Sequence, residues 1–158
     1  MSTRLPVVLA IDTGTQLGWA IRDHLGLLHS GTLNLRGGRY EGGGARFLRF
    51  RKWLQKMWED AGPWNEVYYE EVRRHLGVDA AHCYGGLVAT LTAFCESIPV
   101  PYSAIPVATI KKTATGKGNA NKDVVMAAAL ERWPDQNIRD NNMADALWIL
   151  ETALTQAV

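Results

Sequence analysis

The sequence predicts one α/β domain, residues 1–158, built on a central mixed sheet, and two observations support this class. Apolar, β-prone runs follow one another at 6–11, 17–23 and 26–34, with Gly14 and Gly26 at the turns, which is typical of an antiparallel meander. Two later strands, at 65–69 and 101–105, alternate with helical segments. With 158 residues, 47% of them hydrophobic, the chain can form one full core but is too short for two large lobes.

A first helix is expected at 45–60, because apolar residues recur there at helical spacing. The residues expected to face the core are Phe47, Phe50, Leu54, Met57 and Trp58. Arg46, Arg49 and Lys56 lie on the outer side, and Gly62-Pro63 ends the helix. The glycines at 37–38 and 42–44 form a flexible loop before it that tolerates a phosphate group.

A second helix is expected at 80–97, and it is rich in alanine and glycine. Small residues let another helix approach closely, so this helix is either a dimer face or a surface buried within the monomer. Helices at 121–133 and 142–157 complete the prediction, and the sequence contains no internal repeat and no low-complexity segment.

The net charge of +1 conceals a strong sorting of charge along the chain. Residues 36–56 hold seven basic side chains and one acid, and residues 107–122 hold four lysines and no acid. Acids gather instead at 59–71 and 131–145. This division suits a polyanion held beside a metal centre, whereas the alternative is that the first basic cluster is only the solvated face of a helix.

Two further absences narrow the class of protein. The sequence has no signal-peptide core and no apolar run of roughly 18 residues, so a cytoplasmic protein without membrane contact is expected. Cys83 and Cys95 lack the spacing of a zinc site or a disulfide framework, and we expect both to be reduced packing residues.

Three acids stand where structure alone does not require a charge. Asp12 follows the first strand, Glu70 follows the fourth, and Asp145 falls in the first turn of a final helix that is apolar nearly all round. A desolvated carboxylate needs a cation or hydrogen-bond donors, and carboxylate oxygens suit Mg²⁺. Asn142 lies three residues before Asp145, on the same helix face, and could add a neutral oxygen ligand.

Each acid also has a structural explanation. Asp12 could cap a turn, and Glu70 and its neighbour Glu71 could lie at a solvated strand end. Asp145 could stabilise the helix dipole. The segment TGKG lacks the spacing of a Walker-type loop, so no nucleotide cofactor is expected.

Four segments in order, IDTGTQLGWAI, VYYEEV, IKKTATGKGNANKDVV and NNMADALWIL, resemble the RuvC-type Holliday-junction resolvases of the RNase H-like nuclease superfamily, along the whole chain. The resemblance implies an RNase H-like fold with a central mixed five-stranded sheet flanked by α-helices. It also implies a homodimeric, metal-dependent endodeoxyribonuclease that cuts four-way (branched) DNA by paired symmetric nicks, leaving 5′-phosphate and 3′-hydroxyl ends. Two Mg²⁺ ions per site are expected, with Mn²⁺ as a substitute.

Carried over residue by residue, the resemblance makes Asp12 the central metal ligand, Glu70 the second acid and Asp145 the last acid. Strand alternation leaves Glu71 as an alternative to Glu70. The residues expected to be catalytic are Asp12, Glu70, Asp145, Lys112 and Lys117. The expected metal ligands are Asp12, Glu70, Asn142 and Asp145. The expected DNA contacts are Arg46, Arg49, Arg73, Arg74, Lys111 and Lys122.

The chain departs from the family pattern in three places. Thr13 replaces the proline that often follows the first acid. Asn142 replaces the penultimate acid, and Asp140, two residues earlier, could compensate. The loop after Glu70 holds Arg73, Arg74 and His75 where the family can place an aromatic wedge, although an arginine can also stack on a base.

Three alternative functions compete with junction cleavage. One is a junction-binding protein that does not cleave, if Asn142 disables metal binding. Another is an RNA-processing nuclease of the related YqgF type. A small phosphotransferase of the sugar-kinase and actin superfamily is less favoured, because that fold needs a second lobe.

Overall fold

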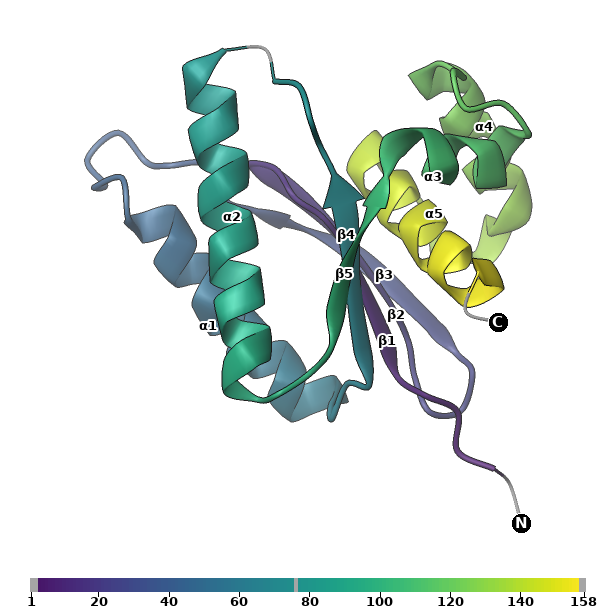
Figure 1. Cartoon of the computed structure of the whole chain (residues 1–158), viewed down its shortest axis with the longest axis horizontal. Helices are drawn as coiled ribbons and strands as arrows, with labels where there is room; N and C mark the ends of the chain where they lie inside the picture. The colour runs from purple at the N-terminus through teal and green to yellow at the C-terminus, as the bar shows by residue number, and fades with distance from the viewer. Residues whose placement is uncertain (1–2, 76, 157–158) are drawn as a thin grey trace.

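The computed structural model describes residues 3–75 and 77–156, and its centre is one five-stranded sheet (Figure 1). The strands are β1 (Val8–Asp12), β2 (Gln16–Arg22), β3 (Leu28–Asn34), β4 (Glu66–Glu71) and β5 (Tyr102–Pro106). The helices are α1 (Ala45–Ala61), α2 (Val78–Ser97), α3 (Val107–Thr115), α4 (Lys122–Arg132) and α5 (Asn141–Gln156), with a 3₁₀ turn, η1 (Pro134–Gln136), before α5. The predicted α/β class is confirmed.

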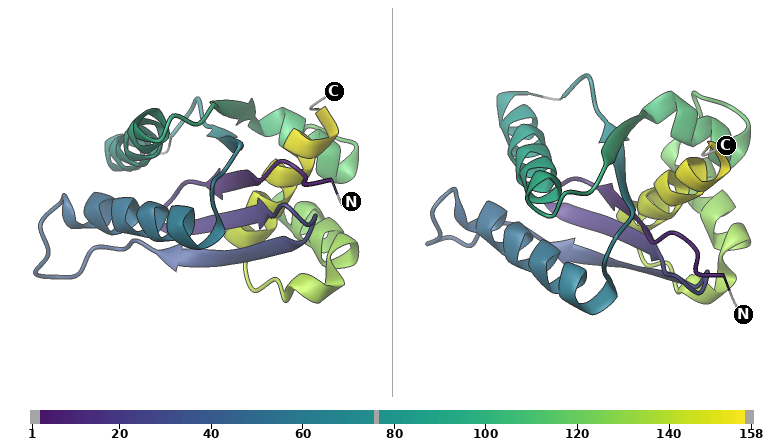
Figure 2. Two further views of the ribbon diagram at one scale, coloured as in Figure 1. Left: turned by 90° about the horizontal axis from the view of Figure 1, so that it is seen from below. Right: turned by 60° about the horizontal axis from the view of Figure 1, so that its bottom comes forward.

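The sheet is mixed, as predicted, with the strand order β3-β2-β1-β4-β5. The meander of β1, β2 and β3 is antiparallel, whereas β4 and β5 run parallel to β1. Helices α1 and α2 cover one face, and α5, with α3 and α4 beside it, covers the other (Figure 2). The carboxyl ends of β1, β4 and β5 therefore lie at one edge, which is where α/β proteins commonly place their sites.

Strand alternation divides the apolar residues between two cores. In β1, Leu9 and Ile11 pack against α1 and α2, while Val8 and Ala10 pack beneath α5. The predicted inward residues Phe50 and Leu54 are fully buried in the first core, whereas Phe47, Met57 and Trp58 are partly buried against it. No helix in the described part of the chain is long and apolar enough to cross a membrane.

The main correction to the predicted elements is α3, since no helix was expected at 107–115. This helix has only nine residues, and β-branched residues such as Val107 and Thr109 give it weak intrinsic propensity. Tertiary packing supplies its stability, because Ile110 is buried among residues of α4 and α5. Gly116 ends the helix in the left-handed conformation and donates its N–H to the carbonyl of Lys112. The other boundaries move by a few residues, and the expected last residue of the final helix lies outside the described part.

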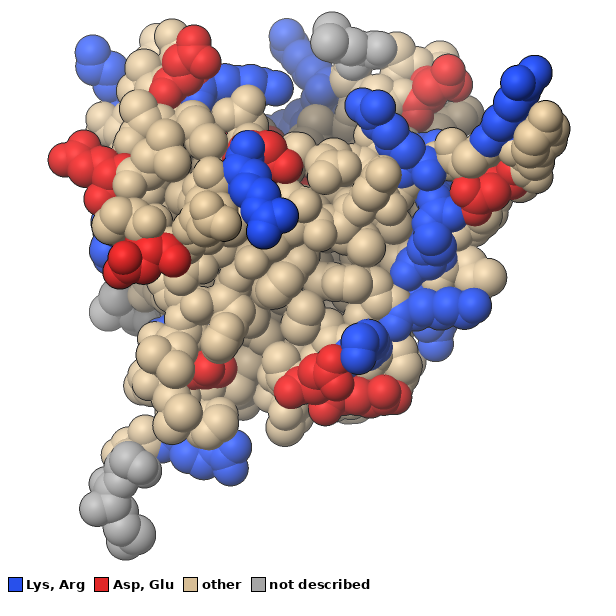
Figure 3. All heavy atoms as spheres, turned by 180° about the vertical axis from the view of Figure 1, so that it is seen from behind, with Lys and Arg blue, Asp and Glu red and all other residues tan. Residues whose placement is uncertain are grey.

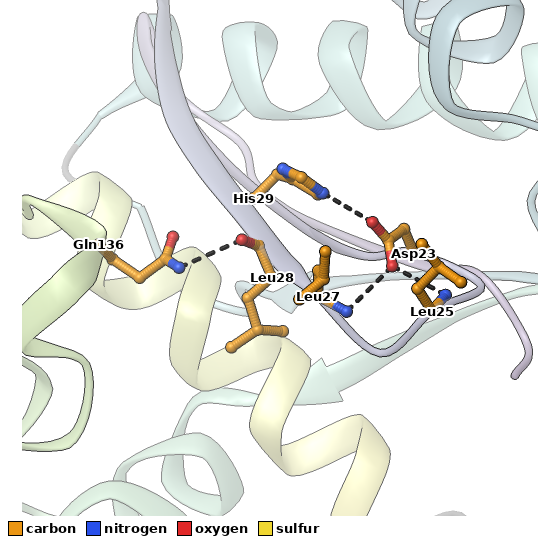
Figure 4. Close-up of polar contacts among 6 residues, drawn as sticks. All are labelled: Asp23, Leu25, Leu27, Leu28, His29 and Gln136. Carbon is orange, nitrogen blue, oxygen red and sulfur yellow. Dashed lines mark hydrogen bonds and ion pairs between the residues drawn. The ribbon is translucent and has the colours of Figure 1, made fainter.

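The hairpin between β2 and β3 is held by one aspartate (Figure 4). Asp23 Oδ1 accepts hydrogen bonds from the backbone N–H groups of Leu25 and Leu27, both at 2.9 Å, and Oδ2 lies 2.8 Å from His29 Nε2. Gln136 of η1 donates to the carbonyl of Leu28 at 3.2 Å. These contacts occupy polar groups at the turn and along the edge strand β3.

A glycine in β2 determines how closely α5 approaches the sheet. A Cβ atom at Gly18 would lie 1.9 Å from the backbone oxygen of Asn142, so only glycine allows the start of α5 to rest on the strand. Gly18 is also the residue paired with Asp12 across β1 and β2. The contact therefore brings the first turns of α5 over the end of β1.

Candidate active site

Asp12 and Glu70 meet at the ends of two neighbouring parallel strands. The register pairs Ala10 with Tyr68 and Ile11 with Tyr69, so the next residues along the two strands are Asp12 and Glu70. Alternation turns both side chains to the face covered by α5, where they share a hydrogen bond. The predicted alternative, Glu71, takes the opposite face, and its carboxylate pairs with Arg73 Nε at 3.1 Å.

Asp145 approaches the same place from α5. The sequence predicted that Asp145 lies in the first turn of this helix. The helix begins at Asn141, so Asp145 lies instead at the start of its second turn. Asp145 and Glu70 line a cavity of about 150 Å³ between β4, α3, α4 and α5. Its other lining residues are Val107, Ile110, Lys111, Lys122 and Val125.

Burial raises the pKa values of all three acids, and the charges of neighbouring acids raise those of Asp12 and Asp145 further. Loss of hydration, followed by the nearby charges of Glu70 and Asp145, raises the pKa of Asp12 well above its ordinary value. Burial and the charge of Glu70 raise the pKa of Asp145 to about 7. Burial also raises the pKa of Glu70, although its hydrogen bond with Asp12 and the charge of Lys111 oppose this. The hydrogen bond that Asp12 and Glu70 share requires one proton between the two carboxyl groups.

Two lysines face the acids. The charges of Lys111 and Lys122 lower the pKa values of both Glu70 and Asp145. Lys111 comes from α3, and Lys122 is the first residue of α4, which Asn121 caps by accepting a hydrogen bond from the Val124 N–H at 3.0 Å. The cavity thus combines carboxylates with ammonium groups, which suits a phosphate held beside a cation.

The lysines expected to be catalytic lie elsewhere. Lys112 lines a separate depression with Thr109, Thr113 and Gln156, among other residues, and Lys117 sits in the turn after α3, where its N–H donates to Thr115 Oγ1 at 3.1 Å. Neither lines the cavity with Glu70 and Asp145. Consecutive residues of a helix point about 100° apart, so Lys111 can face the acids only if Lys112 does not. The sequence pattern predicted no helix at 107–115, so it did not distinguish the directions of these two side chains.

The start of α5 holds the two remaining candidate ligands. Asp140 accepts a hydrogen bond from the Met143 N–H at 2.9 Å, so its carboxylate caps the helix. Its charge also contributes to the raised pKa of Asp145. Asn142 is half-buried, with its backbone against Gly18. The role of either residue as a metal ligand stays a prediction.

The donor set fits a hard divalent cation, because three carboxylates supply oxygen ligands and an excess of negative charge. The fit is incomplete as the side chains stand. Within residues 3–75 and 77–156, no three His, Cys, Asp or Glu side chains already form a group able to hold a metal ion. Binding would have to displace the proton between Asp12 and Glu70 and gather the carboxylates into one group.

Basic side chains also gather over the edge of the molecule where α1 lies (Figure 3). Several of them have protein partners. Arg46 donates to Cys83 Sγ at 3.3 Å, and Arg49 pairs with Glu41 and donates to the carbonyl of Arg36 at 2.8 Å. In the loop after β4, the ring of His75 lies 4.9 Å from that of Tyr84. Arg46 and Arg49 are therefore each held by a protein group, a thiol for Arg46 and a carboxylate for Arg49.

Comparison with known proteins bears on the fold. No protein-family model matches the chain, and no curated protein sequence matches it. Among solved structures, Thermus thermophilus RuvC in complex with Holliday junction substrate matches with a TM-score of 0.77 and 22% identity, over 97% of this chain and 95% of that chain. The chain has the fold of the RuvC resolvases.

Two further structures agree. Another Thermus thermophilus RuvC structure matches with a TM-score of 0.72 and 23% identity, over 96% of this chain and 95% of that one. The yeast mitochondrial Holliday junction resolvase matches with a TM-score of 0.61 and 14% identity, over 96% of this chain and 79% of that chain. The RNase H-like architecture expected from the sequence is therefore confirmed.

Proposed function

We propose that the protein is a metal-dependent endonuclease that resolves four-way DNA junctions. The observation that carries the proposal is the meeting of Asp12, Glu70 and Asp145 with Lys111 and Lys122 at the carboxyl edge of a RuvC-type sheet. This is one site, assembled from five elements of the chain, in which charge is concentrated and partly desolvated. Such a site is the place to expect chemistry on a phosphate.

In this proposal Asp12, Glu70 and Asp145 hold Mg²⁺ or Mn²⁺, two ions per site, with Asn142 as a neutral fourth ligand. The ions supply activation of the attacking water and stabilisation of the leaving oxygen. Lys111 and Lys122 would donate hydrogen bonds to the non-bridging oxygens of the scissile phosphate. Since this phosphate is an anion brought against carboxylates, the lysines also offset the repulsion between them.

A homodimer would present two such sites to a substrate that is itself nearly two-fold symmetric. Helix α2 supports this part of the proposal, because it exposes Gly85 and Ala89 on one face. The bulky charged substitution Ala89→Arg should then shift the protein to a monomer, measured by light scattering, and should abolish paired nicking of one junction. The monomer would still nick one strand of a junction at a time.

The test uses a labelled four-way DNA junction, a linear duplex of the same sequence and an RNA–DNA hybrid, each in Mg²⁺, Mn²⁺ or EDTA. Asp12→Asn serves as the control. Metal-dependent, symmetric nicks in the junction alone, with 5′-phosphate ends, would support a resolvase. Cutting of the hybrid alone would assign the protein to RNA processing of the YqgF type.

The non-cleaving alternative has one specific observation in its favour, which is the neutral Asn142 in place of an acid. It predicts that the wild type binds the junction and leaves it uncut in either metal. Asn142→Asp should then restore cleavage by returning a negative charge to the start of α5. If wild type already cuts, the alternative fails.

A further inference from the structure

Helix α2 touches the candidate active site through one phenol. The hydroxyl of Tyr84 donates to the backbone carbonyl of Glu70 at 2.9 Å and accepts from the N–H of Val72 at 3.1 Å. Both bonds are partly buried, and they span 12 to 14 residues along the chain. One side chain thus holds the backbone on either side of Glu71, where β4 ends.

The sheet supports this part of β4 on one side only, where Glu70 lies opposite Ile105 of β5. The pairing of β1 with β4 reaches Tyr69 and stops, one residue before Glu70. On the other side, the residue opposite Glu71 is Pro106, which has no N–H to donate. The Tyr84 hydroxyl supplies a donor and an acceptor to polar backbone groups at the point where the ladder ends.

The same phenol also contacts the loop beyond β4. The ring of His75 lies 4.9 Å from that of Tyr84, at an interplanar angle of 45°. Tyr84 therefore holds the segment from Glu70 to His75 at both ends, and this segment includes Arg73 and Arg74. Tyr84 therefore holds the backbone of Glu70 from α2, on the face of the sheet opposite the Asp12 side chain.

We propose that Tyr84 is a positioning residue, whose hydroxyl fixes the backbone of Glu70 so that the carboxylate stays beside Asp12. The inference rests on the proposed function only in taking Glu70 as a metal ligand. Tyr84 does not contact the substrate or the ions in this account. It acts through the backbone, as groups behind the ligands of a metal site commonly do.

The test compares Tyr84→Phe, which removes the hydroxyl but keeps the ring against His75, with Tyr68→Phe. The control is matched, because the Tyr68 hydroxyl donates to Glu66 Oε2 at 2.9 Å on the same strand, away from the acids. Five quantities are measured on the folded protein: hydrogen exchange of the Val72 amide, Mn²⁺ affinity by calorimetry without DNA, single-turnover cleavage of a junction at saturating protein, junction affinity in EDTA, and the melting temperature.

For Tyr84→Phe we expect Val72 exchange to be faster and both Mn²⁺ affinity and the cleavage rate to fall by about 10-fold. Junction affinity in EDTA should stay within about 2-fold of wild type, since no phosphate contact is lost. Tyr68→Phe should match wild type in all these quantities. A merely structural role would lower the melting temperature of Tyr84→Phe but leave the Mn²⁺ affinity and cleavage rate unchanged, and that result would overturn the inference.

Failure of the proposed function gives a different pattern. If wild type binds Mn²⁺ but cuts no junction, the resolvase proposal falls, while Mn²⁺ affinity and Val72 exchange still decide the role of Tyr84. If wild type binds no Mn²⁺, both proposals fall, because Glu70 is then not a ligand to be positioned.

Discussion

At the scale of single residues, the proposed cleavage depends on which side chains face the three acids. Lys111 and Lys122 do so, and their charges act on Glu70 and Asp145. Lys112, the next residue along α3, points elsewhere. Lys111 and Lys112 carry the same charge and are adjacent in the chain, so they differ mainly in whether the side chain faces the acids. Substituting each in turn therefore tests the site directly.

Lys111→Gln should lower the single-turnover cleavage rate by about 10²-fold, because it removes a hydrogen-bond donor to the phosphate as charge develops in the transition state. Lys112→Gln should cost much less, no more than about 3-fold, through weakened general attraction to DNA. Rates measured at saturating protein separate the two effects. An equal loss in both variants would contradict the placement of Lys111.

The acids should also affect stability in the absence of metal. The pKa of Asp145 is raised in the folded state to about 7 from an ordinary value of 3.8, by burial and by the charge of Glu70. A raised pKa in the folded state means that the stability linked to this proton is fully present below pH 3.8. It is lost as the pH rises through about 7, since the carboxylate must then ionise where burial and the charge of Glu70 disfavour its charged form.

In EDTA at pH 8, Asp145→Asn should therefore be more stable than wild type, by of order 1–2 kcal/mol. The advantage should shrink as the pH is lowered toward 4, because wild-type Asp145 is then protonated as well. Urea unfolding at several pH values measures this. Parallel curves of unfolding free energy against pH for the two proteins would contradict the raised pKa of Asp145. Added Mn²⁺ should stabilise wild type more than the variant.

At the scale of elements, two contacts lie at opposite ends of the meander. One is the contact of α5 with β2 at Gly18, and the other is the set of hydrogen bonds that closes the β2–β3 hairpin. The first brings Asp145 to Asp12 through Gly18. The second depends on Asp23, near the pair Val8 and Arg22, where β1 begins. Changes at one end should affect the site, and changes at the other should affect only stability.

Gly18→Ala should destabilise the protein by about 2–4 kcal/mol, because the backbone of Asn142 must move to admit a methyl group. The same movement should separate Asp145 from Asp12 and weaken Mn²⁺ binding by the protein that remains folded. Gly43→Ala is a suitable control, since a Cβ there meets nothing within 4 Å. Normal Mn²⁺ affinity in Gly18→Ala would contradict the link between this contact and the site.

Asp23→Ala should cost about 1–2 kcal/mol, because two backbone N–H groups and His29 lose their acceptor. The hydrogen bond with His29 lowers the pKa of Asp23, so this stability is present above its ordinary value of 3.8. It is lost as the pH falls through the lower folded-state value. The difference in unfolding free energy between wild type and Asp23→Ala, measured by urea unfolding, should be smaller at pH 3 than at pH 7. Cleavage by the folded variant should equal that of wild type.

At the scale of the whole molecule, a net charge of +1 does not describe how the protein would meet DNA. Basic residues gather over the edge of the molecule where α1 lies (Figure 3), while Glu70 and Asp145 line the cavity between β4, α3, α4 and α5. Binding to a junction should therefore depend on salt as strongly as it does for a basic protein.

Junction affinity in EDTA should fall by at least about 10-fold between 50 and 200 mM salt, as phosphate contacts release counterions. The double variant Arg46→Ala, Arg49→Ala should bind more weakly at low salt and show a shallower slope of affinity against salt. Fluorescence anisotropy measures both. An unchanged slope would mean that these arginines, already bonded to Cys83 and Glu41, do not reach DNA.

The sequence by itself determined the α/β class, the meander, most of the helices and the positions of Asp12, Glu70 and Asp145 along the chain, because apolar periodicity and strand ends are local properties. Only the tertiary structure decided which of them face one another. Strand register selected Glu70 over Glu71, packing made α3 a helix and turned Lys111 to the acids, and the Gly18 contact set the position of α5. Each depends on atoms far apart in the chain, whose contacts no local pattern encodes.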